Sequence, residues 1–154
     1  MAAIPRMNLT VAASGVFQFK VEGYFFTKET VTSEHEYYQS DMFLVGGHEW
    51  AVRYYPKKAG SDEFRAGLVL LSRPTQGISV RFTLTTLCKS GVPSDTMKGV
   101  ATTDVNCAAA SYYGFGAREV LSFLVGHASM PEFLENDSFV LHCTVSVLKR
   151  PVSL

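Results

Sequence analysis

The side chains best suited to covalent or metal chemistry in this sequence are three cysteines and four histidines. They are Cys88, Cys107, Cys143, His35, His48, His127 and His142. Nucleophilic catalysis needs a nucleophile, a base and an orienting group that the fold brings together. His142 and Cys143 are neighbours in a run with strand character, so their side chains point to opposite faces and cannot pair directly. We therefore predict no catalytic residues and no enzymatic activity; a hydrolase that uses one of these side chains, such as Cys107, is the alternative.

The spacing of these residues also argues against a metal centre. An odd number of cysteines without C-x-x-C spacing fits neither a disulfide framework nor a zinc cluster. Cys143 alternates in phase with apolar neighbours and is predicted to be a small core residue. His48 is interpreted as a turn or packing residue, and His35, between two glutamates, as part of a solvated connection, with a surface metal contact as the alternative. We predict neither a metal site nor a cofactor.

Composition limits the classes of partner. The 154 residues are enough for one domain without disulfides, and the formal net charge is zero with a pI near 6.9. This balance gives no bulk attraction to nucleic acid or anionic lipid, and the pair Lys57 and Lys58 is too short for a nucleic-acid track. The longest apolar run is far shorter than the roughly 20 residues of a membrane-spanning helix. We expect a soluble, intracellular protein of the nucleus or cytoplasm that binds neither nucleic acid nor membrane.

Alternation of apolar and polar residues with a period of two dominates the chain and predicts half-buried strands. The apolar positions are Phe17, Phe19, Val21, Trp50, Val52, Tyr54, Ile78, Val80, Phe82, Leu84, Phe139, Leu141, Cys143, Val145 and Val147. Segments rich in turn formers and charge lie between these runs, at residues 57–62, 73–77 and 89–95. The pattern is typical of an all-β antiparallel sandwich, for which we expect about seven to eight strands, with Trp50 in the core.

Residues 40–56 have the sequence pattern that most clearly predicts a local structure, a β-hairpin. Two runs with strand character flank Gly46 and Gly47, which can take the positive φ angles of a two-residue hairpin turn. Pro56 then removes a donor from the hydrogen-bond ladder. We predict a hairpin that turns at the two glycines and ends at this proline.

Residues 117–125 break the strand pattern. Val120, Leu121 and Leu124 have helical spacing, and Gly126 is placed as a C-terminal stop. We predict a short helix that caps the sandwich. His127 follows it, where a cation would complement the exposed carbonyl groups.

Four motifs give the sequence a family resemblance. They are Gly-Tyr-x-x-Thr-Lys at 23–28, Phe-x-Val-Gly-Gly-His-x-Trp at 43–50, Arg-Tyr-Tyr-Pro at 53–56 and Leu-x-Asn-Asp-Ser-Phe at 134–139. Together they resemble a MATH (meprin and TRAF homology) domain, closest to those that precede a BTB domain in plant adaptors. The resemblance implies a TRAF/MATH-type sandwich over residues 15–148. Residues 1–14 are then expected to be a flexible lead-in and residues 149–154 a tail, without a BTB domain.

The resemblance also implies a function. Domains of this family are non-enzymatic docking modules that hold an extended segment of a partner in a shallow groove on one sheet, and a BTB domain further along recruits a cullin-3 ubiquitin ligase. Main-chain pairing along a strand would supply affinity, while pockets for side chains would supply specificity. We expect protein substrates bound as extended peptides, with cullin-3 reached only indirectly through a BTB domain. The alternatives are an oligomeric TRAF-like scaffold or a stand-alone MATH protein without ligase recruitment, and the oligomeric state is left open.

The same resemblance names candidate groove residues. They are Leu68, Phe82, Tyr113, Gly114 and Phe115. Tyr113 stands where plant members usually have tryptophan, and Leu68 where adaptors often have tyrosine. Phe82 has the parity of a core residue, and an aromatic plug at the end of the sandwich is the alternative for Tyr113 and Phe115. Because Gly116 and Ala117 replace the usual basic residues, this groove is expected to favour apolar anchors over acidic or phosphorylated ones.

Overall fold

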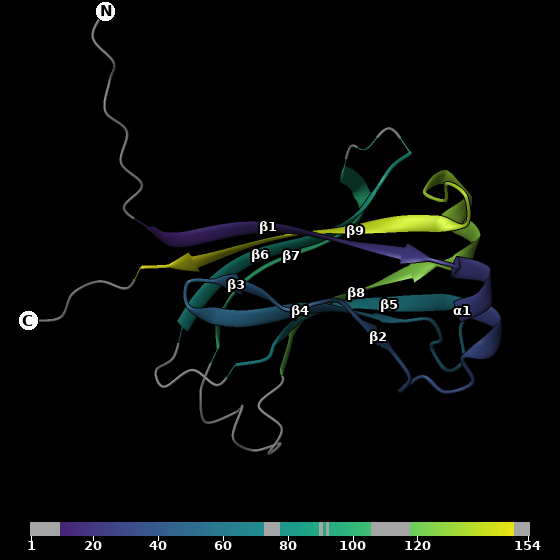
Figure 1. Ribbon diagram of the computed structural model, residues 1–154, viewed down its shortest axis with the longest axis horizontal. Helices are drawn as coiled ribbons and strands as arrows, with labels where there is room; N and C mark the ends of the chain where they lie inside the picture. Colours follow the sequence, from purple (N-terminus) through teal and green to yellow (C-terminus); the bar gives the residue numbers. More distant parts are fainter. Residues whose placement is uncertain (1–9, 73–77, 90, 92, 106–117, 150–154) are drawn as a thin grey trace, which may run out of the picture.

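The computed structural model describes residues 10–72, 78–89, 91, 93–105 and 118–149, and these residues form two antiparallel sheets packed face to face (Figure 1). This confirms the predicted all-β antiparallel sandwich. Nine strands lie in the described part of the chain, rather than seven or eight. None of the helices in these ranges is long and apolar enough to cross a membrane.

The first sheet has four strands in the order β1-β9-β6-β7. Their bounds are β1 Val11–Glu22, β9 Ser138–Leu148, β6 Ile78–Leu87 and β7 Pro93–Val105. Phe17 pairs with Cys143 and Cys143 with Leu84, so core side chains from three strands form one row. β1 begins inside the expected 1–14 lead-in, because residues 11–14 already pair with β9.

The second sheet has the order β2-β4-β5-β8, and β3 pairs with β4 beside β2. The bounds are β2 Tyr38–Gln39, β3 Phe43–Val45, β4 His48–Tyr55, β5 Glu63–Leu70 and β8 Arg118–Gly126. All of its pairings are antiparallel. Residues 56–62 connect β4 to β5 at one end of this sheet. Gly126, the last residue of β8, lies at the same end, because it pairs with Glu63.

The predicted hairpin is confirmed between β3 and β4. Val45 pairs with His48, and the two residues between them, Gly46 and Gly47, have φ angles of 62° and 78°. Positive φ at both central positions is what a type I′ turn requires and what only glycine adopts readily. Tyr55 is the last residue of β4, directly before Pro56.

Gly46 and Gly47 have the same type of backbone conformation but different space around them. Their alanine variants therefore form a matched pair that isolates the cost of packing. A Cβ on Gly46 would lie 2.8 Å from Val147 Cγ2, whereas a Cβ on Gly47 would meet nothing within 4 Å. Both alanine variants incur the left-handed backbone cost of about 1 kcal/mol, and Gly46→Ala adds an overpacking cost of about 1–2 kcal/mol. Urea unfolding should therefore show a clearly larger loss for Gly46→Ala. Equal losses would contradict the packing of this turn against β9.

A short helix, α1 (Tyr24–Thr30), follows β1 and was not predicted. Gly23 enters it with a φ of 75°. Its first turn is capped from far along the chain, because Asp137 accepts hydrogen bonds from Tyr24 N–H through its carbonyl (3.0 Å) and from Phe25 N–H through Oδ1 (3.1 Å). The capping residue lies 112 positions from Phe25 in the sequence, so the local sequence contains no signal for this helix.

The predicted helix over residues 117–125 is wrong, because residues 118–126 form strand β8. Its pairing with β5 shifts register: Leu68 pairs with Leu121, but the next residue, Val69, pairs with Glu119. Val120 is therefore an extra residue in a β-bulge, which breaks the period of two and gives the apolar residues helix-like spacing. A short 3₁₀-helix, η1 (His127–Glu132), follows instead.

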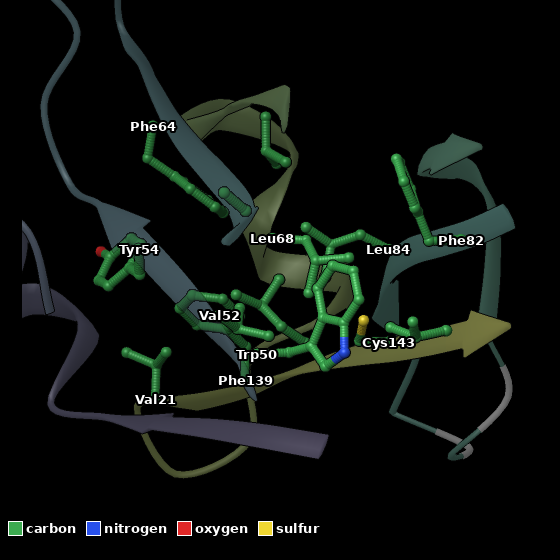
Figure 2. Packing of buried hydrophobic residues seen from close by; sticks show 14 of the residues in the cluster. Val21, Trp50, Val52, Tyr54, Phe64, Leu68, Phe82, Leu84, Phe139 and Cys143 are labelled. Carbon is green, nitrogen blue, oxygen red and sulfur yellow. The ribbon is translucent and has the colours of Figure 1, made fainter. Parts of the chain in front are cut away.

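The core lies between the two sheets and draws on both (Figure 2). Trp50 is fully buried, as predicted, and its Nε1–H donates to the Val45 carbonyl at 3.3 Å. Cys143 is also fully buried, and burial raises the pKa of its thiol to about 12. This confirms Cys143 as a core residue, since a thiol with that pKa stays protonated at neutral pH.

Candidate functional site

The candidate site is the long edge of the sandwich formed by β7 and β8. β7 is the last strand of the four-stranded sheet and β8 is the last strand of the five-stranded sheet, and the two strands contact each other. In the described part of the chain β8 pairs only with β5. The outer backbone groups of an edge strand are a template for another extended chain. The outer side of β8, with which no other described strand pairs, is therefore the candidate position for an additional strand.

Successive side chains of β8 from Ser122 to Val125 point alternately to the solvent and to the core. Ser122 and Leu124 are exposed on the outer face, with Leu124 41% exposed, whereas Val125 is buried toward the core. Phe123 is partly buried and packs against the core. A segment added beside β8 would thus find an apolar and a hydroxyl side chain on the solvent side.

A stack of aromatic and charged side chains covers the outer face of the neighbouring strands. The Arg65 guanidinium lies 3.8 Å from the centre of the Tyr55 ring, and Arg53 lies 4.3 Å from the centre of the Tyr37 ring. The Tyr37 and Tyr55 rings are 5.3 Å apart, which joins the two pairs. Because Arg65 and Tyr37 cover Tyr55, it is buried although it faces outward.

Glu119 ties this stack to β8. Its Oε1 pairs with Arg65 Nη1, and its Oε2 accepts a hydrogen bond of 3.4 Å from the Tyr55 hydroxyl. A Cβ on Gly67 would lie 2.5 Å from Glu119 Oε1, so the glycine makes room for the carboxylate to lie over β5. The start of β8 is thereby held against β5 by charge as well as by main-chain bonds.

This sandwich and its edge can be compared with known proteins. A family model described as the MATH domain matches residues 16–145. The chain belongs to the MATH domain family. The resemblance carried by the four sequence motifs is thereby confirmed.

Curated relatives of this MATH domain come from Arabidopsis thaliana. BTB/POZ and MATH domain-containing protein 3 is 26% identical over 148 residues, covering 88% of this chain and 34% of the relative. BTB/POZ and MATH domain-containing proteins 5 and 4 are each 26% identical and cover 92% of this chain, with 35% and 31% of the relatives. The chain thus spans about a third of the length of these curated relatives.

The structure describes two of the five predicted groove residues. Tyr113, Gly114 and Phe115 lie outside the described residues, in the connection between β7 and β8. Leu68 on β5 and Phe82 on β6 are both fully buried within the core of the MATH domain. Their side chains offer no surface to a ligand in this structure, which agrees with the core alternative stated for Phe82. The edge residues Ser122 and Leu124 were missed, because the sequence assigned them to a helix.

The residues considered for catalysis or metal binding are separated. His142 Nδ1 accepts a 3.2 Å hydrogen bond from Nε2 of the exposed Gln18 side chain, while Cys143 points into the core. His35 is exposed and lies 3.7 Å from Glu34. Across the described ranges, no three His, Cys, Asp or Glu side chains gather as a metal site would require. Cys107 lies outside the described residues.

His127 is not the cation at a helix end that the sequence predicted, because β8 takes the place of that helix. It is buried in η1, its Nε2–H donates to the Pro56 carbonyl at 3.1 Å, and its Nδ1 accepts from the Tyr24 hydroxyl. Burial lowers the pKa of His127, so the neutral ring is favoured. Its role in this MATH domain is to join α1, the β4–β5 turn and η1.

Proposed function

We propose that this MATH domain binds an extended peptide segment of partner proteins along the free edge of β8. The observation that carries the proposal is the position of β8 at the end of its sheet, paired only with β5 in the described part of the chain. Main-chain bonds to such an edge give affinity with little sequence preference, and the flanking side chains choose among peptides. Membership of an interaction-module family supports the same function.

We further propose that the domain supplies substrate recognition to a cullin-3-type ubiquitin ligase when it is joined to a BTB domain. The support is that the Arabidopsis relatives carry both BTB/POZ and MATH domains by name. In this arrangement the sandwich holds the substrate and the BTB domain holds the ligase. Nuclear or cytoplasmic partners would be the substrates.

Peptide binding can be tested with a display library of unstructured peptides and a pair of matched leucine variants. Leu124 on β8 and Leu44 on β3 are both exposed strand residues, at 41% and 66%. Leu124→Glu should weaken the binding of selected peptides about tenfold, because a charge replaces an apolar contact beside the added strand. Leu44→Glu, on the far edge of the sheet, should leave the affinity unchanged.

Tyr113→Ala provides a second arm, with thermal melting to check that each variant is folded. Loss of binding in a folded Tyr113→Ala variant would place the preceding connection in the same site. If Leu124→Glu and Leu44→Glu bind peptides equally well, the β8 edge is not the binding site. For the ligase step, a fusion to the BTB domain of one of the relatives should direct ubiquitin to a reporter that carries a selected peptide, and Leu124→Glu should reduce that transfer.

A further inference from the structure

A cavity of about 250 Å³ beside the β4–β5 turn carries an unusual concentration of positive charge. It is lined by Glu34, His35, Lys57, Lys58 and Arg65. Three permanent cations and one carboxylate therefore meet at a single small hollow, in a chain whose formal net charge is zero. Like charges repel unless an anion lies between them, so such a hollow favours an anionic ligand.

The turn that presents the two lysines is held in place. Ala59 N–H donates to Glu34 Oε2 at 3.1 Å, and Lys57 Nζ donates to the Thr32 carbonyl at 3.2 Å. Ser61 N–H closes the turn on the Lys58 carbonyl at 3.3 Å. The one carboxylate of the cavity is thus engaged by a backbone donor, and the cavity is built before any ligand arrives.

Two cations remain able to bind a ligand. Lys58 Nζ forms no ion pair with any described residue, and Arg65 uses only Nη1 on Glu119. The Arg65 guanidinium is oriented by the Tyr55 ring beneath it. A planar guanidinium fork next to a mobile ammonium group is the combination that binds the oxygens of a phosphoryl group.

We propose that this pocket, lined by Lys57, Lys58, Arg65 and His35, binds a phosphoryl group on a phosphorylated side chain of the protein that the MATH domain recognises. The proposal rests on the proposed function, because it places the phosphorylated residue in the same bound segment. A phosphoryl group carries about two negative charges and three acceptor oxygens, which the cations of the pocket can share. One hollow of this size suits one such group, whereas nucleic acid needs a longer track of cations.

The position of the pocket fits a ligand that begins on β8. Arg65 pairs with Leu124 of β8, so it lies one strand in from the free edge. Neighbouring strands are about 5 Å apart, and a peptide on that edge therefore lies about 10 Å from Arg65. A residue that follows the paired segment past Gly126 can turn over β5 and reach the pocket.

The test measures binding by fluorescence anisotropy with degenerate peptide pools that carry one phosphoserine or phosphothreonine, beside the same pools without phosphate. The phosphorylated pools should bind about tenfold more tightly to the unmodified domain. Lys58→Ala should remove most of that preference and leave the affinity for unphosphorylated peptides unchanged. Lys89→Ala, which removes an exposed lysine elsewhere, should change neither value. Raising the salt concentration should weaken the preference, since the charges are partly exposed.

The measurements distinguish whether the phosphoryl site alone is wrong or peptide binding along β8 is wrong as well. If unphosphorylated peptides bind in a Leu124-dependent manner and phosphate adds nothing, the phosphoryl site is wrong and peptide binding stands. If inorganic phosphate binds but phosphorylated pools gain nothing, the ligand is not a modified side chain and the proposal is overturned. Binding to phosphatidylserine vesicles in place of phosphopeptides overturns it as well. If no peptide binds in either form, both proposals fail.

Discussion

Replacing Trp50 by alanine is expected to lower the free energy of unfolding by about 3–5 kcal/mol, the usual cost of deleting a large buried aromatic side chain. The indole is fully buried between the sheets, and its Nε1–H donates to the Val45 carbonyl next to the β3–β4 turn. The substitution therefore leaves a cavity in the centre of the core and removes the bond that ties the hairpin to it. Small domains have a total stability of about 5–15 kcal/mol, so the variant would be close to unfolding.

A second substitution at Trp50 separates the loss of side-chain volume from the loss of the hydrogen bond, and a substitution at an exposed residue serves as the control. Trp50→Phe keeps an aromatic side chain but loses the hydrogen bond, and we expect a loss of about 1–2 kcal/mol. Val16→Ala, at a side chain that is 66% exposed, should change stability by less than about 0.5 kcal/mol. Urea unfolding at equilibrium measures all three. A loss in Trp50→Ala no greater than that in Trp50→Phe would show that the indole volume does not fill the core.

Features of the fold that depend on neighbouring residues were predictable from the sequence. The alternation through β1, β4, β6 and β9 specifies which side chains face inward, and the positive φ angles at Gly46 and Gly47 follow from the residue type. Both signals are local, because strand parity and turn geometry depend on residues close together in the chain. Two of the four family motifs, at 43–50 and 53–56, lie in the β3–β4 hairpin and at its end, whereas the motif at 23–28 covers the beginning of α1.

Features that depend on distant contacts were missed. The cap of α1 comes from Asp137, which is 112 residues away from Phe25. The bulge at Val120 exists only through pairing with β5, and without it the apolar residues of β8 have helical spacing. The stack of Arg53, Tyr37, Tyr55 and Arg65 requires three segments of the chain, the residues next to β2, β4 and β5, to lie side by side. The candidate edge and the basic pocket could therefore not be predicted from the sequence.

The second large effect is expected at His127, which connects three parts of the chain at one end of the sandwich. Its Nε2–H donates to the Pro56 carbonyl, so its Nδ1 is the acceptor for the Tyr24 hydroxyl. His127→Ala would leave both partners buried without a hydrogen bond, at about 1–3 kcal/mol each. We expect a total loss of about 2–6 kcal/mol in the free energy of unfolding. A loss below about 1 kcal/mol would show that water replaces the ring without cost.

The same residue makes the stability depend on pH. Burial is the main cause of the lowered pKa of His127, and the nearby Lys28 ammonium adds to it, whereas the bond to Pro56 and the carboxylate of Asp62 act in the opposite direction. The unfolded chain binds the proton near the ordinary histidine pKa of about 6.5, and the folded chain binds it only at lower pH. The neutral ring therefore contributes its full stabilisation above about pH 6.5. That stabilisation is lost as the pH falls from there through the lowered pKa of the folded state.

Urea unfolding between about pH 7.5 and 5 measures this dependence, and two glutamine variants separate its source. His127→Gln should flatten the curve over the upper part of the range, because glutamine keeps a donor and an acceptor but does not titrate. His35→Gln serves as the matched control, since the His35 side chain is 87% exposed and its removal should leave the curve unchanged. An unaltered slope in His127→Gln would mean that other groups cause the acid sensitivity. A flattened slope would instead show that protonation of one buried ring loosens α1, η1 and the β4–β5 turn together, at the end of the sheet that carries the basic pocket.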